Sequence, residues 1–487
     1  MEKVKILSEL FTKKYNCSPT GIERLPGAGS GRKYFRLYAG AASCIGVVGE
    51  NIRDCRAFVE LSCVFKEAGI MVPEVYDVSA DGLCYLQEDF GDISLFDLIS
   101  KIRKENDSLS GAEEAMESYV GEALRQLARM QCVPYGKWVD AAEYAPFSRR
   151  QIFWDLNYFK YEYLRPAAID FDEEALENDF ERFAGRLMKE AEYASGFMYR
   201  DFQSRNVMIV GDRCGFIDYQ GGRKGPSLYD AVSFLWQAKA KFSKEFREKM
   251  LSLYADEYCG IRGIDKNEFL SSTCLFALFR TLQVLGAYGL RGLVERKAHF
   301  LESIPAALDN LSELISEGVL HEYPELLSVS KALINDLRFK NKGKKGDPLT
   351  VEVFSFSYKK GYPADFSGNG GGFMFDCRGM HNPGRYEEYK KITGLDEPVI
   401  KFLQEKGETD LFSLRAFELV EPTVARYKER GFTNLQIGFG CTGGQHRSVY
   451  CAEKVSKMLA ERFPEVHIKV NHREQGISKI YNFQQHL

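Results

Sequence analysis

The sequence lacks the patterns that would assign a class of protein at once. Its 12 cysteines include no C-x-x-C pair, and residues 1–15 are amphipathic and lysine-rich, unlike the apolar core of a secretory signal. No apolar stretch approaches the roughly 20 residues that cross a bilayer. We therefore expect reduced, buried thiols in a cytoplasmic protein without a membrane partner, and neither a disulfide framework nor a zinc site.

Neither positive nor negative side chains are in large excess. The 65 Lys and Arg residues against 69 Asp and Glu residues give a net charge of −4, which provides no global electrostatic case for nucleic acid. No G-x-x-x-x-G-K-[ST] phosphate loop and no internal repeat occurs in the sequence. With 487 residues and an ordinary apolar fraction of 45%, the chain should hold two or three domains of roughly 100–200 residues each.

What the sequence does contain falls into regions of different periodicity. Residues 1–95 alternate short β-like runs with one helical stretch over 51–69, and helical periodicity dominates residues 96–336. Lysine, glycine and proline replace that periodicity over 337–349, which predicts an exposed basic linker. Strands and helices alternate again over 350–487, an order typical of an α/β domain with a largely parallel sheet.

The stretch YRDFQSRNVM, residues 199–208, contains the parts that phosphoryl transfer needs. A carboxylate must meet the acceptor hydroxyl, and oxygen ligands must hold Mg²⁺ against the β- and γ-phosphates. Asp201 is the candidate carboxylate, and Asn206 is the candidate metal ligand. Two β-like runs around a Gly-Asp turn then return the chain to Asp218, a second candidate metal ligand. An Asp at a strand end is common, whereas this combination is not.

A cluster of glycines precedes this region. Gly27, Gly29 and Gly31 lie between two β-like runs in LPGAGSGRKYFRL, where backbone N–H groups could approach phosphates without interference from Cβ. Such a cluster alone is more often a flexible hairpin, but its place before a β-helix-β pattern favours a nucleotide lid. Glu60, inside the helix over 51–69, could orient a phosphate-binding cation or could equally be a solvated surface residue.

These residues carry a resemblance to a known family. Residues 1–336 resemble the aminoglycoside-phosphotransferase-like kinases, most of all the anomeric N-acetylmuramate or N-acetylglucosamine kinases, through GSGRKYFRL, GIMVPEVY, LQEDFGD, YRDFQSRNVM, FIDYQGGRKGPSLYD and RTLQVLGAYG. The resemblance implies an α+β bilobal protein-kinase-like fold with ATP in its cleft and the adenine near Glu88. It implies Asp201 as catalytic base, Asn206 and Asp218 as Mg²⁺ ligands, and a supporting role for Asp230.

Two positions depart from the pattern of that family. The run SCIGVVGENI lacks the strand lysine that pairs with the α- and β-phosphates, and Arg32, Lys33 or Arg36 could substitute for it. Tyr199 stands where the family has a His that packs and orients the catalytic loop. Because a Tyr keeps an aromatic body with one polar tip, we expect the role to survive. Arg32 joins the glycines as a candidate nucleotide-binding residue.

The acceptor of the phosphoryl group is open on the sequence alone. FWDLNYFKYEYL, residues 153–164, could form an aromatic wall for a sugar ring or could be an amphipathic core helix. DFDEEALENDFE, residues 170–181, would suit a polycationic aminoglycoside. A solvated helix with Asp170 or Asp172 near its N-cap explains that acidic stretch better.

A second chemistry-bearing stretch is IGFGCTGGQHRS, residues 437–448, between an apolar strand and a helix. Its glycine-containing turn aims backbone N–H groups and the positive helix end at one spot, and His446 and Arg447 can add charge there, which predicts phosphate binding. Cys441 and Arg447 also have the separation found in cysteine phosphatases, so a thiolate nucleophile is one alternative. A small buried Cys beneath a binding loop is the other.

Residues 350–487 resemble the C-terminal domain of the RapZ family of RNase adapter proteins, through FSFSYKKGYP, FDCRGMHNPGRY, TGLDEPV, GCTGGQHRSVYCAE and NHRE. In that family the domain binds glucosamine-6-phosphate, presents RNA to partners and can oligomerise, so a homo-oligomer is one expectation. The basic tail that holds RNA in the family is missing, and RNA binding would need the lysines over 340–345. The resemblance implies a sugar-phosphate site lined by Asp376, Arg378, Asn382, Cys441, Thr442, Gly443, Gly444, Gln445, His446, Arg447 and Ser448.

Together these observations predict an ATP- and Mg²⁺-dependent sugar kinase fused to a domain that binds a phosphorylated amino sugar. One alternative is a nucleotide- and metabolite-responsive RNA-binding adapter with an inactive kinase half, which the missing strand lysine suggests. Another alternative is a cysteine phosphatase in the C-terminal domain.

Overall fold

The computed structural model describes residues 2–26, 31–238, 240–336, 347–365 and 372–481. Two compact units divide the chain. The first comprises Met1–Phe153, Asn178–Thr281 and Leu314–Glu322, and the second comprises Trp154–Glu177, Leu282–Glu313 and Tyr323–Leu487. The predicted domain boundaries near residues 95, 336 and 350 stay predictions.

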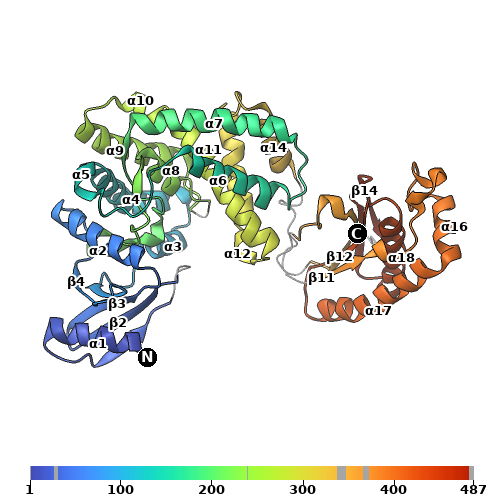
Figure 1. Cartoon of the computed structure of the whole chain (residues 1–487), viewed down its shortest axis with the longest axis horizontal. Helices are drawn as coiled ribbons and strands as arrows, with labels where there is room; N and C mark the ends of the chain where they lie inside the picture. Colours follow the sequence, from blue (N-terminus) through green and yellow to red (C-terminus); the bar gives the residue numbers. More distant parts are fainter. Residues whose placement is uncertain (1, 27–30, 239, 337–346, 366–371, 482–487) are drawn as a thin grey trace. The chain divides into compact units, whose positions relative to one another are not determined.

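A five-stranded sheet in the order β1-β2-β3-β5-β4 opens the first unit, and every neighbouring pair of strands in it is antiparallel. Helix α1 lies along this sheet (Figure 1) and buries Leu7 and Phe11 against Leu37, Cys44 and Leu86. Leu7 and Phe11 are four residues apart and therefore share one helix face. The elements are α1 (Glu2–Tyr15), β1 (Gly21–Arg24), β2 (Lys33–Ala39), β3 (Ala42–Val48), α2 (Ile52–Glu67), β4 (Val75–Val78) and β5 (Cys84–Glu88).

The predicted helix over residues 51–69 is confirmed as α2. Asn51 caps its first turn, because the side-chain oxygen of Asn51 accepts a hydrogen bond from the backbone N–H of Arg53 at 3.0 Å. Gly69, two residues beyond the end of α2, adopts a left-handed φ of +80° that other residues rarely take, so the chain can turn away here. Phe58 and Phe65 bury one face of α2.

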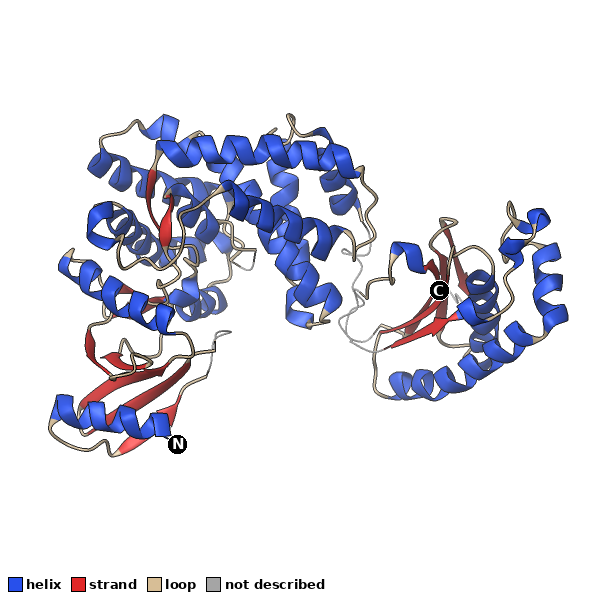
Figure 2. Ribbon diagram, in the orientation of Figure 1, coloured by secondary structure: helices blue, strands red, loops and turns tan. Residues whose placement is uncertain are grey.

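Helices dominate the chain between β5 and β10 (Figure 2). The longest are α4, α7 and α9, while the strands are short. The elements are α3 (Leu95–Glu105), α4 (Leu109–Gln131), α5 (Tyr135–Trp138), α6 (Arg149–Phe159), η1 (Lys160–Leu164), α7 (Glu173–Tyr193), β6 (Ser195–Met198), η2 (Ser204–Asn206), β7 (Val207–Val210), β8 (Arg213–Phe216), β9 (Arg223–Pro226), α8 (Leu228–Leu235), α9 (Lys244–Arg262), α10 (Lys266–Leu270), α11 (Thr273–Tyr288), η3 (Gly289–Val294), α12 (Ala298–Leu301), α13 (Ile304–Ser316) and α14 (Pro324–Asn335).

The two β-like runs after Asn206 are confirmed as the antiparallel hairpin β7-β8. Val207 pairs with Phe216, and Val210 pairs with Arg213 at the turn. Gly211 has a φ of +61° at this turn, which suits a two-residue hairpin connection. The hairpin therefore carries the chain from Asn206 directly back toward Asp218.

The C-terminal sheet has the strand order β11-β12-β10-β13-β14, and every pair except β13-β14 is parallel. Helix α18 packs on this sheet and α17 packs on α18 (Figure 1). Strand β14, which follows a turn at Gly476, was not expected from the sequence. The elements are β10 (Thr350–Ser357), η4 (Tyr358–Lys360), β11 (Gly372–Asp376), η5 (Cys377–Gly379), η6 (Pro383–Arg385), η7 (Glu387–Tyr389), α16 (Glu397–Lys406), α17 (Glu408–Glu429), β12 (Asn434–Cys441), α18 (Arg447–Arg462), β13 (His467–His472) and β14 (Ile477–Tyr481).

The expected fold class is confirmed: a protein-kinase-like fold precedes a separate domain with a mostly parallel sheet. The expectation that no apolar stretch approaches the length of a membrane span was wrong for one helical stretch among the described residues, because Lys266–Val294 is long and apolar enough by length and composition. Its most apolar window is 61% buried inside the protein, as in the core helix of a globular domain.

Candidate functional site

The catalytic loop between β6 and β7 brings the predicted phosphotransfer residues together. Asp201 is exposed, and its carboxylate accepts a hydrogen bond from the side-chain amide of Gln203. The side-chain amide nitrogen of Asn206 donates to the backbone oxygen of Asp201 at 2.9 Å, which leaves its amide oxygen as the atom able to ligate a cation. The backbone N–H of Ile217 donates to the backbone oxygen of Asn206 at 3.1 Å. This bond joins the loop to the segment that carries Asp218.

Two buried side chains hold this loop in place. The hydroxyl of Tyr199 donates to the backbone carbonyl of Ile217, so Tyr199 supports the loop as expected for the residue at that position. The carboxylate of Asp230 accepts the backbone N–H groups of Tyr199 and Arg200 at 2.7 and 2.8 Å. Burial raises the pKa of Asp230 to about 7, although the two N–H groups and the amide of Gln131 lower it.

The backbone is strained at two points of the same site. Arg200 and Asp218 have φ values of +72° and +69°, a region that residues other than glycine rarely adopt. Such conformations persist only where the surroundings hold them, and they gather at functional sites. Here the hydrogen bonds to Asp230 hold Arg200, and the two bonds to the backbone of Ile217 hold the residue before Asp218.

Arg32 is the cation that meets Asp218. Its guanidinium is 9% exposed and forms an ion pair with the Asp218 carboxylate. Arg36, in contrast, is held by two bonds to Asp89 at 2.7 and 3.1 Å and by an ion pair with Asp92 at 2.7 Å. Lys33 is exposed at the start of β2. Of the three cations proposed to replace the strand lysine, Arg32 is therefore the one placed at the predicted metal ligands.

The oxygen donors at this point suit a divalent cation such as Mg²⁺. Asp218 supplies a carboxylate and Asn206 supplies an amide oxygen, and Mg²⁺ prefers such hard ligands. The side-chain oxygen of Gln220 is a buried acceptor without a hydrogen-bond partner among the described residues, next to Asp218. No group of three or more His, Cys, Asp or Glu in the described part of the chain could hold a metal on its own. The donor set thus fits a cation that is held jointly with nucleotide phosphates.

The other predicted nucleotide-binding residues are Gly27, Gly29, Gly31, Glu60 and Glu88. Gly27 and Gly29 lie outside the described residues. Gly31 is described, and a Cβ there would come within 2.3 Å of the Glu50 carboxylate, so a side chain would displace Glu50. Glu60 lies on the exposed face of α2, and no described residue forms an ion pair with it. The carboxylate of Glu88 accepts from the backbone N–H of Glu74 at 3.1 Å and pairs with an α2 lysine.

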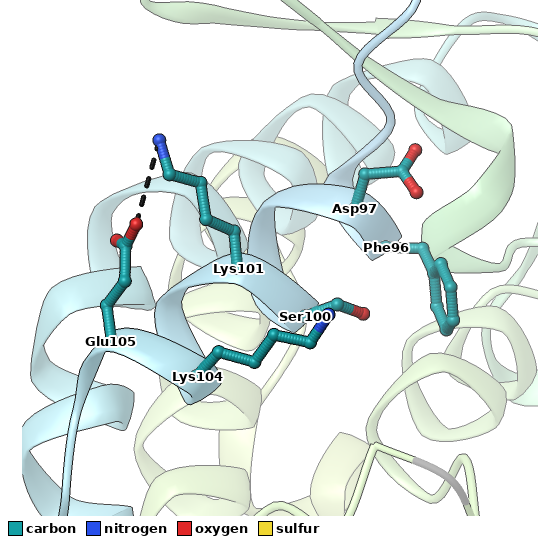
Figure 3. A pocket seen from close by; sticks show the side chains of 6 residues that line it. All are labelled: Phe96, Asp97, Ser100, Lys101, Lys104 and Glu105. Carbon is teal, nitrogen blue, oxygen red and sulfur yellow. Dashed lines mark ion pairs between the residues drawn. The ribbon is translucent and has the colours of Figure 1, made fainter.

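An open pocket lies on α3 (Figure 3). Helix α3 contacts the short helix η2, which contains Asn206. Lys101 and Glu105 form an ion pair across its rim at 3.9 Å. The guanidinium of Arg205, next to Asn206, stacks over the ring of Phe96 at 4.5 Å. Charges of both signs line the pocket, and it includes none of the predicted site residues. Its lining residues are Phe96, Asp97, Ser100, Lys101, Lys104 and Glu105.

The aromatic stretch over 153–164 has two different faces. Trp154 and Tyr161 are 62% and 51% exposed, whereas Phe159 and Tyr163 are fully buried. The exposed face keeps the sugar-wall interpretation open, and the buried face is core. In the acidic stretch, Asp172 accepts the backbone N–H of Ala175 at 2.8 Å, as the predicted N-cap position requires.

The C-terminal site lies at the carboxyl ends of parallel strands. Asp376 ends β11 and pairs in register with Gly440 of β12, directly before Cys441. The Asp376 carboxylate is bound by the guanidinium of Arg378 at 2.7–3.0 Å, and that guanidinium stacks over the ring of Tyr358 at 3.9 Å. Ligands of open α/β sheets bind at this edge of the sheet.

Three side chains of the glycine-rich turn hold a neighbouring loop. Gln445 donates to the backbone oxygens of residues 390 and 392 at 2.9 and 2.8 Å, and a ring nitrogen of His446 lies 2.9 Å from the backbone oxygen of Tyr389. Nη1 of Arg447 donates to the backbone oxygens of Arg378 and Met380, both at 2.8 Å. Its Nε is buried and has no hydrogen-bond partner among the described residues. Nε of Arg447 is therefore a buried donor that no described residue uses.

The remaining predicted residues complete the turn. The side chain of Asn382 accepts the backbone N–H of Gly384 at 3.2 Å and caps a short helical turn. Thr442 and Gly443 are exposed. Gly444 has a φ of +65°, and a Cβ there would come within 2.8 Å of the backbone nitrogen of Ser357, so only glycine fits. The turn thus follows the backbone of β10 closely.

Cys441 lies beneath this turn. Its sulfur is 3.1 Å from the hydroxyl oxygen of Ser448, and the residue is 3% exposed. Burial raises the pKa of the Cys441 thiol, but hydrogen bonds from Ser448, the charge of Arg447 and the backbone of Gln445 outweigh it and lower the pKa below the ordinary value. The residue also belongs to the hydrophobic core of the domain.

Several supporting residues were not anticipated from the sequence. Gln220 donates to Asp218 at 2.8 Å and follows it by two positions in FIDYQ, so its closeness to the motif was the available signal. In the C-terminal domain, Ser355, His472 and Glu453 form a hydrogen-bonded chain with distances of 2.8 and 2.9 Å. Because Ser355 and His472 are fully buried, this chain anchors the strand ends and is no nucleophilic triad.

Models of two protein families match two separate parts of the chain. The phosphotransferase enzyme family (APH) matches residues 22–267, and the RapZ C-terminal domain matches residues 349–476. Nucleotide-binding protein LBA0691 of Lactobacillus acidophilus is 35% identical over 131 residues, which are 27% of this chain and 42% of that protein. Nucleotide-binding protein BBR47_52620 of Brevibacillus brevis is 31% identical over 179 residues, which are 37% of this chain and 58% of that protein. The chain therefore spans about half the length of the curated relatives it matches.

Solved structures include proteins similar to the first part. Choline kinase from Cryptosporidium parvum has a TM-score of 0.43 and 13% identity, over 67% of this chain and 99% of that chain. The phosphotransferase match itself spans just over half of the 487 residues. The chain belongs to the phosphotransferase enzyme family (APH), and it carries a RapZ C-terminal domain.

Proposed function

We propose that this protein transfers the γ-phosphoryl group of ATP, with Mg²⁺, to a hydroxyl of an amino sugar, and that its C-terminal domain binds a phosphorylated amino sugar. The observation that carries the kinase proposal is the linkage of Asp201, Asn206 and Asp218 through one loop and one hairpin. A carboxylate for the acceptor and oxygen ligands for the metal are thereby held in one rigid segment.

Asp201 orients the acceptor hydroxyl and accepts its proton as the oxygen attacks the γ-phosphorus. Its exposure leaves it accessible to a sugar, and Gln203 holds one of its oxygens. Asn206 and Asp218 would hold Mg²⁺, which when bound neutralises charge on the β- and γ-phosphates. Arg32 takes the part of the absent strand lysine, and its fork of N–H donors suits phosphate oxygens.

In the C-terminal domain the phosphate would bind at the N-terminus of α18. Backbone N–H groups of the turn before this helix and the positive end of its dipole both favour an anion there. The buried, unpartnered Nε of Arg447 adds a charged donor at the same point. The sugar itself would meet Asp376 and Asn382 at the neighbouring strand end.

We propose that Cys441 forms part of the binding site and does not act as a nucleophile. Its sulfur is engaged with Ser448 and belongs to the core, which favours a wall beneath the phosphate over a nucleophile. Cys441→Ser should therefore leave the hydrolysis of p-nitrophenyl phosphate by the full chain at the wild-type background level. A wild-type rate that the substitution abolishes would establish a phosphatase instead.

The kinase proposal is tested by phosphoryl transfer from radiolabelled ATP to a panel of amino sugars and neutral sugars. We expect transfer to at least one amino sugar, and a loss of about 10²–10⁴-fold in kcat for Asp201→Ala. Asp140→Ala, a substitution in the short segment after α5, serves as the control. Equal background transfer by wild type and Asp201→Ala to every sugar would overturn the proposal.

A further inference from the structure

The metal ligand Asp218 already carries a positive partner from the protein itself. Nη2 of Arg32 and the side-chain nitrogen of Gln220 both bind the same carboxylate oxygen, Oδ1. Arg32 comes from the segment before β2, 186 residues away in sequence, whereas Gln220 follows Asp218 by two residues. One carboxylate therefore serves a guanidinium and is also the predicted ligand of a divalent cation.

These two positive charges compete for one carboxylate. A guanidinium and a divalent cation at neighbouring oxygens repel each other, and the repulsion is strong where water is scarce. Arg32 is 9% exposed, so solvent screens it poorly. Nucleotide phosphates change the balance, because they carry enough negative charge to bind the guanidinium and the cation together.

In the ion pair between Arg32 and Asp218, Arg32 is the residue whose side chain can move. Asp218 has a left-handed backbone conformation, and the residue before it is held by the hydroxyl of Tyr199 and by the backbone oxygen of Asn206. These bonds fix the backbone that carries the Asp218 carboxylate. The Arg32 side chain is long and reaches Asp218 from a different lobe of the fold.

Gln220 provides the second observation at this site. The residue is 7% exposed, and its side-chain nitrogen donates to Asp218 at 2.8 Å. Its side-chain oxygen is buried and has no hydrogen-bond partner among the described residues. Buried acceptors are rarely left without a donor, because the loss of hydration is costly. A water molecule bound to a cation at Asp218 is a donor of the kind that this oxygen lacks.

We infer that Arg32 is an internal cation that couples nucleotide binding to metal binding, with Gln220 as a positioning residue for the metal. Arg32 occupies Asp218 in this structure and would move to nucleotide phosphates when they bind, which would leave the Asp218 carboxylate to hold a divalent cation. Gln220 would stay on Asp218, and its side-chain oxygen would be the acceptor for the hydration shell of a bound cation. This inference rests on the proposed kinase function and adds an order of binding to it.

The test measures the two binding events separately on the full chain. Mn²⁺ binding is followed by electron paramagnetic resonance with and without AMP-PNP, and AMP-PNP binding is followed by calorimetry with and without Mn²⁺. In wild type each ligand should tighten the other by the same factor, about 10–100-fold, because linkage is reciprocal. Thermal unfolding of each variant verifies that it is folded.

Arg32→Gln removes the internal cation. It should bind Mn²⁺ alone about tenfold more tightly than wild type, bind AMP-PNP about tenfold more weakly, and lose most of the coupling. Lys33→Gln, at the exposed neighbouring cation, is the matched control and should match wild type. Gln220→Leu should weaken Mn²⁺ binding in the presence of nucleotide, while AMP-PNP alone binds as it does to wild type.

The outcomes separate this inference from the proposed function. If wild type binds AMP-PNP and Mn²⁺ and Arg32→Gln keeps the same coupling and the same affinity for Mn²⁺ alone, the inference is overturned and the kinase proposal stands. If wild type binds no AMP-PNP with any divalent cation, both are overturned. Weaker AMP-PNP binding by Gln220→Leu without Mn²⁺ would exclude the positioning role of Gln220.

Discussion

The hydroxyl of Tyr199 donates a hydrogen bond to the backbone carbonyl of Ile217, the residue directly before Asp218. One aromatic side chain thereby ties the segment before Asp201 to the segment that follows the hairpin β7-β8. Tyr199 was expected to support this loop through an aromatic body with one polar tip, and that polar tip makes the hydrogen bond to Ile217. The apparent anomaly in YRDFQSRNVM is therefore a structural substitution.

Tyr199→Phe removes this hydroxyl and leaves the half-buried carbonyl of Ile217 without its donor. We expect unfolding of the phosphotransferase region to become easier by about 1–3 kcal/mol, with a lower kcat because Asp218 is less firmly held. Urea unfolding followed by tryptophan fluorescence checks this, since all 3 tryptophans lie between residues 138 and 236. Tyr193→Phe, whose hydroxyl binds Glu268 near the surface, is the control. Unchanged stability of Tyr199→Phe would contradict the assigned role.

The raised pKa of Asp230 should make the unfolding free energy of the protein depend on pH in an unusual way. Burial raises the pKa of its carboxyl from 3.8 to about 7, so the folded protein keeps a proton that the unfolded chain releases. The stability it contributes is complete below pH 3.8 and is lost as the pH rises through 7. Asp230→Asn cannot ionise. The difference in unfolding free energy between wild type and this variant should shrink by about 2–3 kcal/mol from pH 5 to pH 8.

The same tryptophan-monitored urea unfolding at pH 5, 6, 7 and 8 measures that difference. Asp140→Asn, whose carboxyl lies in the short segment after α5, provides the comparison and should show no such trend. A difference that stays constant or grows with pH would show that Asp230 is ionised in the folded protein.

The lowered pKa of Glu453 should have the opposite effect in the C-terminal domain, where stability is lost as the pH falls. Although burial raises its pKa, hydrogen bonds from His472, Lys479 and Tyr481 lower it from 4.5 to about 2. Its stabilising effect is present above pH 4.5 and is lost as the pH falls toward 2. At neutral pH, Glu453→Gln should destabilise strands β13 and β14 by about 3 kcal/mol, and the loss should vanish near pH 2.

Hydrogen exchange of the β13 and β14 backbone, read by mass spectrometry on the full chain, isolates this domain from the rest. Glu461→Gln, on an exposed part of α18, is the matched control. Faster exchange in Glu453→Gln that persists unchanged at pH 2 would exclude the charge as its cause.

Arg447→Lys tests the anion site. Lysine keeps the charge but loses the planar fork that binds two backbone carbonyls with one edge and offers Nε on another. We expect the affinity for glucosamine-6-phosphate to fall by at least about tenfold, with faster hydrogen exchange over residues 378–392. Arg462→Lys, at the far end of the same helix, should change neither quantity. If Arg447→Lys binds glucosamine-6-phosphate with the wild-type affinity, the phosphate does not bind at Arg447.

Local spacing made much of the fold and of the site predictable. The helix over 51–69, the hairpin after Asn206 and the parallel strands over 350–487 all follow from periodicities of 3.6 or 2 and from turn residues. The catalytic loop and the glycine-rich turn are short continuous segments, so their residue types and order were readable in one line of sequence. Strand β14 was missed because its short run is half exposed and carries no strong alternation.

Contacts between distant segments were not predictable in the same way. Three cations could have replaced the strand lysine, and only packing separated Arg32 at Asp218 from Arg36 at Asp89. Arg447 was expected to add charge at the glycine-rich turn, and the structure shows in addition that Nη1 holds the backbone at residues 378 and 380. Periodicity carries no information about such partners, because they are set by how the elements pack.

The sequence by itself determined where the two candidate sites lie, the loop over residues 199–206 and the glycine-rich turn over residues 437–448, since each is encoded in consecutive residues. Only the tertiary structure decided which cation meets the metal ligand Asp218 and which buried atoms, such as Nε of Arg447 and the side-chain oxygen of Gln220, are left for a ligand. The physical reason is that burial and partner choice depend on side chains that are far apart in sequence and adjacent only after folding.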